Sequence, residues 1–182
     1  MGDFWVFGYG SLIWRPGFAH TETRRARLNG YRRALCVRSH VHRGTPERPG
    51  LVLGLDRGGS CIGLAFRVPA DLADEVMTYL RERELVTDVY LERRLPVRLD
   101  DGAIVEAVTY VVDRHHIQYA GRIDVEDAAH IVSGSAGRSG ANEDYVINTV
   151  AHLRALGIRD HWLEGVAARI TPVEAAVRHP AP

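Results

Sequence analysis

Residues 4–12 have the sequence FWVFGYGSL, in which a run of aromatic and β-branched residues ends at Gly8. Such a run favours a short buried β-strand, and the glycines at its end favour a tight loop. Similar runs follow, separated by a polar loop and by a glycine pair. We therefore expect further strands at residues 21–29, 31–39, 50–56 and 61–68. Their spacing predicts a meandering, mostly antiparallel sheet.

Between Pro69 and Glu84 the apolar residues recur at three and four positions, as on one face of an α-helix. Two more strands are expected after this helix, at residues 89–99 and 103–112. The Asp101-Gly102 pair between them is a hairpin signal.

The remainder of the chain is predicted to be helical. One helix opens at Asp124, and a glycine- and serine-rich turn follows at residues 133–140. A second helix covers residues 142–156 and stops at Gly157, and a short last one covers residues 159–168.

The length of 182 residues suits one compact domain. Since no internal repeat or linker interrupts the pattern, we expect a single α+β domain over residues 1–170 and a frayed tail at 171–182. The formal net charge is zero, which argues against wholesale binding of nucleic acid or an anionic membrane. No apolar run approaches the ~18 residues of a membrane-spanning helix, and the first residues lack the basic region of a signal peptide.

All 23 basic side chains are arginine, because the chain contains no lysine. Schiff-base chemistry, a P-loop phosphate anchor and a lysine general base are therefore excluded. Residues 1–50 hold nine arginines against three acids, a surplus that either solvated strand faces or an anion site would explain. Cys36 and Cys61 lack the spacing of a disulfide framework or a zinc ribbon, so we expect reduced thiols and a cytoplasmic location.

Glu84 ends an apolar row with a spacing of four residues along the predicted helix. The row consists of Leu72, Val76 and Leu80. A carboxylate at the edge of the core is desolvated, which raises its pKa and suits it to accept a proton near neutral pH. Glu84 is therefore a candidate general base. In the alternative, structural interpretation, the helix ends before residue 84 or an arginine such as Arg83 or Arg33 pairs with the carboxylate.

The loop at residues 8–11, Gly-Tyr-Gly-Ser, has the components of an anion cradle: glycines that bring backbone N–H groups close to a ligand, and a hydroxyl donor. It is no dinucleotide fingerprint, because Ile13 stands where the third glycine belongs. A tight turn at the end of a strand would select the same glycines. His40 and His42 lack further partners with ligand spacing, so we expect no metal.

Five motifs occur in order between residues 4 and 166. They are WVFGYGSLIW (5–14), YRR (31–33), HRGTPERPG (42–50), Arg83-Glu84 and GRSGANEDY (137–145). Together they resemble the ChaC-like family of γ-glutamylcyclotransferases, the glutathione-specific branch once described as cation transport regulators, and the form is that of bacterial members.

The resemblance implies a small closed β-barrel flanked by helices. It also implies an enzyme without metal or organic cofactor that converts a small molecule, glutathione, into 5-oxoproline and Cys-Gly. Glu84 matches the catalytic glutamate by position. The matched substrate-binding residues are Tyr9, Gly10, Ser11, Leu12 and Tyr145. Glu75 matches a secondary acidic position of some members.

Such a reaction needs no lysine, metal or nucleophilic side chain, because the α-amine of the substrate attacks its own γ-carbonyl. One carboxylate of raised pKa can take the amine proton and return it to the leaving nitrogen, while the N–H groups of residues 9–12 hold the substrate. The early arginines suit the carboxylates of an anionic tripeptide. They include Arg32, Arg33 and Arg43.

Two stretches depart from the family pattern. Ala34 and Leu35 replace aromatic residues of many animal members, and residues 85–90 replace a glycine pair and an early tyrosine. Both lie close to the expected pocket, so they bear on turnover and on selectivity for the thiol side. The alternatives are a cyclotransferase for other γ-glutamyl-amino acids or γ-glutamylamines and a non-catalytic γ-glutamyl-binding regulatory protein.

Overall fold

The computed structural model describes residues 2–170, so the predicted tail at 171–182 lies outside the described residues. Internal contacts divide the chain into two compact units. The barrel unit comprises Met1–Val37 and Leu53–Gly121, and the helical unit comprises Arg38–Val52 and the described part of Arg122–Pro182. The single domain expected over residues 1–170 stays a prediction.

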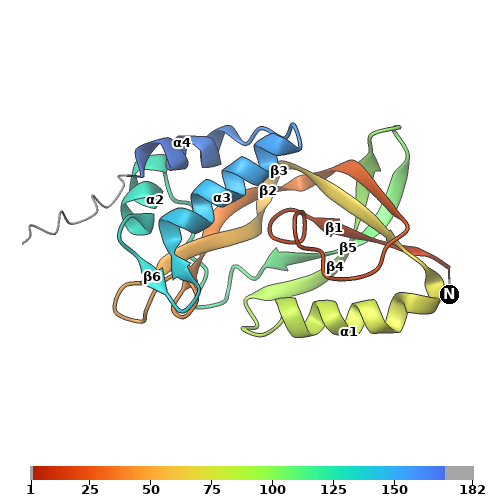
Figure 1. Ribbon diagram of the computed structural model, residues 1–182, viewed down its shortest axis with the longest axis horizontal. Coiled ribbons are helices and arrows are strands. Elements are labelled where there is room, and N and C mark those ends of the chain that lie inside the picture. Colours follow the sequence, from red (N-terminus) through yellow and green to blue (C-terminus); the bar gives the residue numbers. More distant parts are fainter. Residues whose placement is uncertain (1, 171–182) are drawn as a thin grey trace, which may run out of the picture. The chain divides into compact units, whose positions relative to one another are not determined.

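A closed β-barrel with the strand order β1-β3-β2-β4-β5 dominates the barrel unit (Figure 1). Its strands are β1 (Phe4–Gly8), β2 (Glu22–Ser39), β3 (Gly50–Val68), β4 (Tyr90–Leu99) and β5 (Ile104–Val112). β1 pairs antiparallel with β3, and β4 pairs antiparallel with both β2 and β5. A parallel pairing of β1 with β5 contributes to closure. The predicted α+β barrel is therefore confirmed.

Two strands run further than the sequence pattern predicts. β2 is continuous through Gly30, and β3 is continuous through Gly58 and Gly59, where we expected breaks. The three glycines have φ angles of 87°, 99° and 72°, which only glycine adopts without strain. Each strand therefore bends at its glycines, and such bends allow a long strand to follow the wall of a small barrel.

The predicted helix of residues 69–84 consists of a 3-10 turn, η1 (Ala70–Leu72), followed by α1 (Ala73–Glu84). α1 runs beside the barrel strands (Figure 1). Its buried Val76 and Leu80 join a hydrophobic cluster to which β1, β3, β5 and the loop after β1 also contribute. Burying side chains of this size stabilises the fold by roughly 1.5–3 kcal/mol each, which explains why α1 stays on the barrel.

The helical unit contains three helices and a two-stranded sheet. They are α2 (Val125–Val132), β6 (Ala136–Gly137), β7 (Gly140–Ala141), α3 (Asn142–Ala155) and α4 (His161–Arg169). The Asp124 side chain caps α2 by accepting from the N–H of Asp127 at 2.8 Å, and Gly157, with a φ of 67°, follows α3. Both predicted signals are confirmed, whereas the small sheet inside the glycine-rich turn was not predicted.

Candidate active site

Glu84 is the last residue of α1, so the helix does not end before it. It follows the fully buried Leu80 by one turn, and its own side chain is 18% exposed. Burial raises the pKa of the Glu84 carboxyl above its ordinary value, and the positive charge of Arg83 opposes this rise. A raised pKa brings the carboxylate nearer to the working range of a general base at neutral pH.

The Glu84 carboxylate has little competition for its lone pairs. Its ionic neighbour is Arg83, whose Nε lies 3.4 Å from Oε1. Among residues 2–170, no group donates a hydrogen bond to this carboxylate within ordinary limits. The arginine pairing that the sequence left open therefore exists, but it leaves the carboxylate able to accept a proton from a ligand.

The loop after β1 uses some of its backbone N–H groups in internal hydrogen bonds and leaves three consecutive ones without an acceptor among the described residues. The carbonyl of Gly10 accepts from the N–H of Ile13 at 2.9 Å, and that of Ser11 accepts from the N–H of Arg15 at 2.8 Å. The N–H groups of Gly10, Ser11 and Leu12, in contrast, have no acceptor within residues 2–170. Consecutive N–H groups without a partner are the kind of donors that an anion site uses. Substrate or anion binding by this loop stays a prediction.

The same loop is held against α1, the helix that carries Glu84. Leu12 belongs to the hydrophobic cluster that contains Leu80. At Gly17, where φ is 74°, a Cβ atom would lie 2.0 Å from Oη of Tyr79, so only glycine allows this approach. The structure thus brings the loop and the carboxyl-terminal half of α1 together in one unit.

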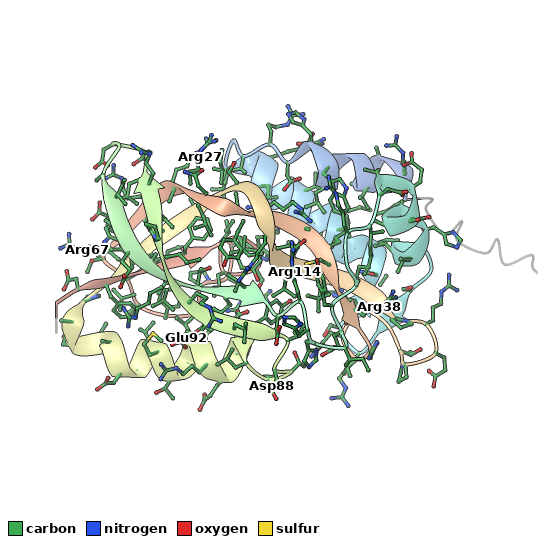
Figure 2. The ribbon with its side chains drawn as sticks, turned by 180° about the vertical axis from the view of Figure 1, so that it is seen from behind. Arg27, Arg38, Arg67, Asp88, Glu92 and Arg114 are labelled. Carbon is green, nitrogen blue, oxygen red and sulfur yellow. The ribbon has the colours of Figure 1, made fainter. Side chains whose placement is uncertain are left out.

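The sequence reasoning missed a polar pair beside Glu84. The hydroxyl of Tyr110, a buried residue of β5, donates to Oε2 of Glu92 at 3.3 Å. Glu92 lies on β4 beside α1 (Figure 2) and accepts two hydrogen bonds from Arg81, at 2.8 and 2.9 Å. Burial raises the pKa of Tyr110, and the negative charges of Glu92 and Glu84 raise it further. Tyr110 therefore remains a neutral hydroxyl close to the candidate base.

Glu92 itself differs from Glu84 in its electrostatics. Hydrogen bonds from Arg81 lower the pKa of Glu92, an effect that outweighs its partial burial. It is therefore ionised at neutral pH and unsuited to exchange protons there. In the sequence, Glu92 and Tyr110 look like ordinary residues of two strands. Strand alternation is one signal that would have placed Tyr110 on the same face of β5 as Val108, the face that packs against α1.

Glu75, matched to a secondary acidic position, is exposed in the first turn of α1. Nine residues separate it from Glu84, which puts the two on roughly opposite faces of the helix. The structure does not bring these carboxylates together, and a role for Glu75 stays a prediction.

Arg43 and Tyr145 meet within the helical unit. The guanidinium carbon of Arg43 lies 5.3 Å from the centroid of the Tyr145 ring, and Nη1 donates to the carbonyl of Ala141 at 3.1 Å. The ring holds the guanidinium plane by a cation–π contact. Substrate binding by either residue stays a prediction.

The motif at residues 137–145, which contains Tyr145, also contributes to the structure of the helical unit through Asn142. Asn142, fully buried at the start of α3, accepts from the N–H of Leu51 at 2.7 Å and donates to its carbonyl at 2.8 Å. A second contact is close packing, because a Cβ atom on Gly50 would lie 2.6 Å from the Asn142 side chain. Loop 42–50 is therefore fastened to α3 by backbone-like hydrogen bonds.

The other early arginines serve the barrel itself. Arg33 is buried, and it donates to the carbonyls of Tyr9 and Ile62, both at 2.6 Å. Arg32 donates to the carboxylate of Asp56 at 2.5 Å. Both guanidinium groups thus have protein acceptors, and the Arg33 contact at Tyr9 supports the end of β1 and the start of the loop.

Further features bear on cofactors and location. Within residues 2–170, no group of three or more His, Cys, Asp or Glu side chains is arranged to hold a metal ion. Cys36 and Cys61 are buried thiols and form no disulfide with each other; burial raises the pKa of the Cys36 thiol to about 12. None of the helices in the described part of the chain has the length and apolar character needed to cross a membrane.

Comparison with known sequences and structures supports these observations. The chain is 34% identical over 169 residues to the glutathione-specific γ-glutamylcyclotransferase of Escherichia coli (strain K12), covering 93% of this chain and 73% of that protein. It is 35% identical over 176 residues to the glutathione-specific γ-glutamylcyclotransferase of Schizosaccharomyces pombe, covering 85% of each.

Among solved structures, a crystal structure of a γ-glutamyl cyclotransferase specific to glutathione from yeast superposes with a TM-score of 0.81. The superposition covers 92% of this chain and 97% of the yeast chain at 24% identity, so it speaks for the fold alone. Residues 4–172 match the ChaC-like protein family. The chain therefore belongs to the ChaC-like family.

Proposed function

We propose that the protein is a γ-glutamylcyclotransferase that cleaves glutathione to 5-oxoproline and Cys-Gly. The observation that carries the proposal is the meeting, in one unit, of the Glu84 carboxylate, whose pKa is raised by burial, with a loop whose N–H groups lack acceptors. The names of the relatives in Escherichia coli and Schizosaccharomyces pombe support glutathione as the substrate.

In the proposed reaction Glu84 accepts a proton from the α-amine of the γ-glutamyl group. The freed nitrogen lone pair attacks the γ-carbonyl carbon, so that a carbon–nitrogen bond closes the five-membered ring. The bond to the cysteinyl nitrogen then breaks, and that nitrogen receives two protons: the one held by Glu84 and the surplus one on the new ring nitrogen. The lactam keeps one hydrogen, Cys-Gly leaves with a protonated amine, and Glu84 is ionised again. Every atom of glutathione appears in the two products, and no water, oxidant or reductant is consumed.

The loop supplies the second element of catalysis. Negative charge develops on the γ-carbonyl oxygen when the amine attacks, and N–H groups aimed at it stabilise the transition state. Gly10, Ser11 and Leu12 offer such donors. Tyr9 completes the proposed loop site, and Tyr110 adds a neutral hydroxyl beside Glu84.

The reaction needs the ionised form of Glu84, and Arg83 is suited to maintain it. Burial alone would drive the carboxyl toward its neutral form, in which it cannot accept a proton. The adjacent positive charge opposes that trend. We therefore propose that activity rises with pH through the pKa of Glu84.

A cytoplasmic location is proposed as well. Glutathione is a thiol, and two buried cysteines that form no disulfide with each other suit a reducing compartment.

Product analysis on a substrate panel tests the proposal. The purified protein is incubated with glutathione, a γ-glutamyl-amino acid without the glycine, a γ-glutamylamine, and ophthalmate, in which a methyl group replaces the thiol. We expect 5-oxoproline and Cys-Gly from glutathione. Faster release of 5-oxoproline from the γ-glutamylamine would move the activity to another γ-glutamyl compound. Binding of glutathione by calorimetry without any product would contradict catalysis and indicate a binding protein.

A further inference from the structure

We infer that Arg83 is a positioning residue for this reaction. Its guanidinium group holds the loop of residues 11–16 at a fixed position relative to the Glu84 carboxylate. The inference rests on the proposed function and assigns a task to a residue that itself need not touch the substrate. It follows from where the nitrogen atoms of this one side chain are directed.

One terminal nitrogen binds the far end of the loop. Nη1 of Arg83 donates to the carbonyl of Arg15 at 2.7 Å and lies 3.3 Å from that of Pro16. It also donates to Oη of Tyr79, one turn earlier on α1, at 2.7 Å. These contacts draw the carbonyls of the loop toward the helix.

The other nitrogens reach the two proposed elements of the site. Nη2 donates to the hydroxyl of Ser11 at 2.9 Å, and Nε lies 3.4 Å from Oε1 of Glu84. Arg83 therefore contacts both the middle of the donor loop and the candidate base. Its side chain is 21% exposed, so solvent has limited access to these contacts.

The planar shape of the guanidinium group allows Arg83 to make these contacts together. A guanidinium offers five N–H donors in one rigid plane, whereas an ammonium is a single point charge. A lysine at residue 83 would keep the positive charge near Glu84 but would not span Ser11, Arg15 and the carboxylate together. Charge and positioning can therefore be separated by substitution.

The two roles predict different kinetic effects. Loss of the charge raises the pKa of Glu84, because burial then acts without opposition, and the acid limb of the pH–rate profile moves to higher pH. Loss of the planar set of N–H donors lets the N–H groups of the loop move relative to Glu84. This lowers kcat, since displacements of about 1 Å reduce the reaction rate by on the order of 100-fold.

The test compares Arg83→Met and Arg83→Lys with the unaltered protein for kcat, KM and the pH dependence of kcat/KM. We expect Arg83→Met to lower kcat by about 10- to 100-fold and to shift the acid limb upward. Arg83→Lys should keep the acid limb near its original position while kcat stays reduced. Arg67→Met is the control, since Arg67 is an exposed residue of β3 that pairs with Asp3.

Two further measurements test the role of Arg83 without any turnover. They can be made even if the protein fails to cleave glutathione, an outcome that would contradict the proposed function. Carbon NMR of the Glu84 carboxyl should titrate at higher pH in Arg83→Met. Amide hydrogen exchange should speed up at Ile13 and Arg15, whose N–H groups are hydrogen-bonded within the loop. A variant with unchanged kcat, pH profile, Glu84 titration and loop exchange would overturn the inference. A uniform loss of stability with none of these specific changes would also overturn it, because it would indicate a purely structural role.

Discussion

Two carboxylates of the barrel unit are buried in very different ways. Asp56, on β3, has a fully buried side chain that accepts hydrogen bonds from Arg32, Arg114 and Tyr119. Glu84 is 18% exposed and has one ionic neighbour among the described residues. The comparison teaches that burial alone does not define a carboxylate: the supply of donors separates one whose oxygens are satisfied from one that can still accept a proton.

Both oxygens of the Asp56 carboxylate accept hydrogen bonds, unlike those of Glu84. Arg32 binds Oδ2 at 2.5 Å, Arg114 binds Oδ1 at 2.7 Å, and the Tyr119 hydroxyl lies 3.2 Å from both oxygens. Arg114, which follows β5 (Figure 2), and Arg32 also donate to the carbonyl of Arg57. Such a network fastens the segment after β5 to β3, and a buried charge needs this degree of satisfaction to be tolerated.

The largest expected effect comes from Glu84→Gln, which keeps the shape of the side chain and removes its ability to take a proton. We expect release of 5-oxoproline from glutathione to fall about 10²- to 10⁴-fold, the range typical of general acid–base catalysis. Chromatographic assay of the product measures the loss. The thermal unfolding temperature should not fall, because Glu84 carries an unfavourable burial that glutamine lacks.

Glu82→Gln is the matched control for that substitution. Glu82 is exposed on the same helix two residues earlier, so removal of its charge should leave turnover unchanged. Retention of full activity by Glu84→Gln would end its assignment as the base and make the carboxylate a structural one, like Asp56.

Asp56→Asn should lower stability and leave activity unchanged, the opposite of the result expected for Glu84→Gln. Two guanidinium groups would lose their carboxylate, and we expect the free energy of unfolding to drop by about 3 kcal/mol. Turnover per folded molecule should remain close to that of the unaltered protein, as measured at low temperature after urea denaturation has defined the folded fraction. If the Asn variant were as stable as the parent but inactive, the division between a structural and a catalytic carboxylate would be reversed.

The smallest effect is a difference in the pH dependence of stability. Because the folded pKa of Glu84 lies above its unfolded value of about 4.3, the folded state binds the proton more tightly. Stability should therefore decrease as the pH rises from the unfolded pKa through the folded pKa, and it should stay lower above that window. Glu84→Gln lacks this contribution.

Urea midpoints of the parent and Glu84→Gln, compared from pH 4 to pH 8, measure the difference. The Gln variant should gain relative stability as the pH rises. If the stability of the Gln variant minus that of the parent stayed constant or fell with rising pH, the raised pKa would be contradicted.

Local signals predicted most of the elements. The strand and glycine loop at residues 4–12, the helix that ends at Glu84 and the hairpin at Asp101-Gly102 all depend on near neighbours in the chain. The breaks expected near Gly30 and Gly58 were wrong, because strand pairing around a barrel continues through bends that a glycine otherwise marks as turns.

The sequence by itself determined which chemistry is available: the chain has no lysine, and the apolar row that ends at Glu84 makes this carboxylate the candidate for proton transfer. The tertiary structure alone decided which side chains surround each acid. Asp56 lies 24 residues from Arg32 and 58 from Arg114, and Ser11 lies 72 residues from Arg83. Periodicity reports the direction of a side chain within its own element, whereas hydrogen-bond partners and pKa values depend on contacts that barrel closure creates between distant segments.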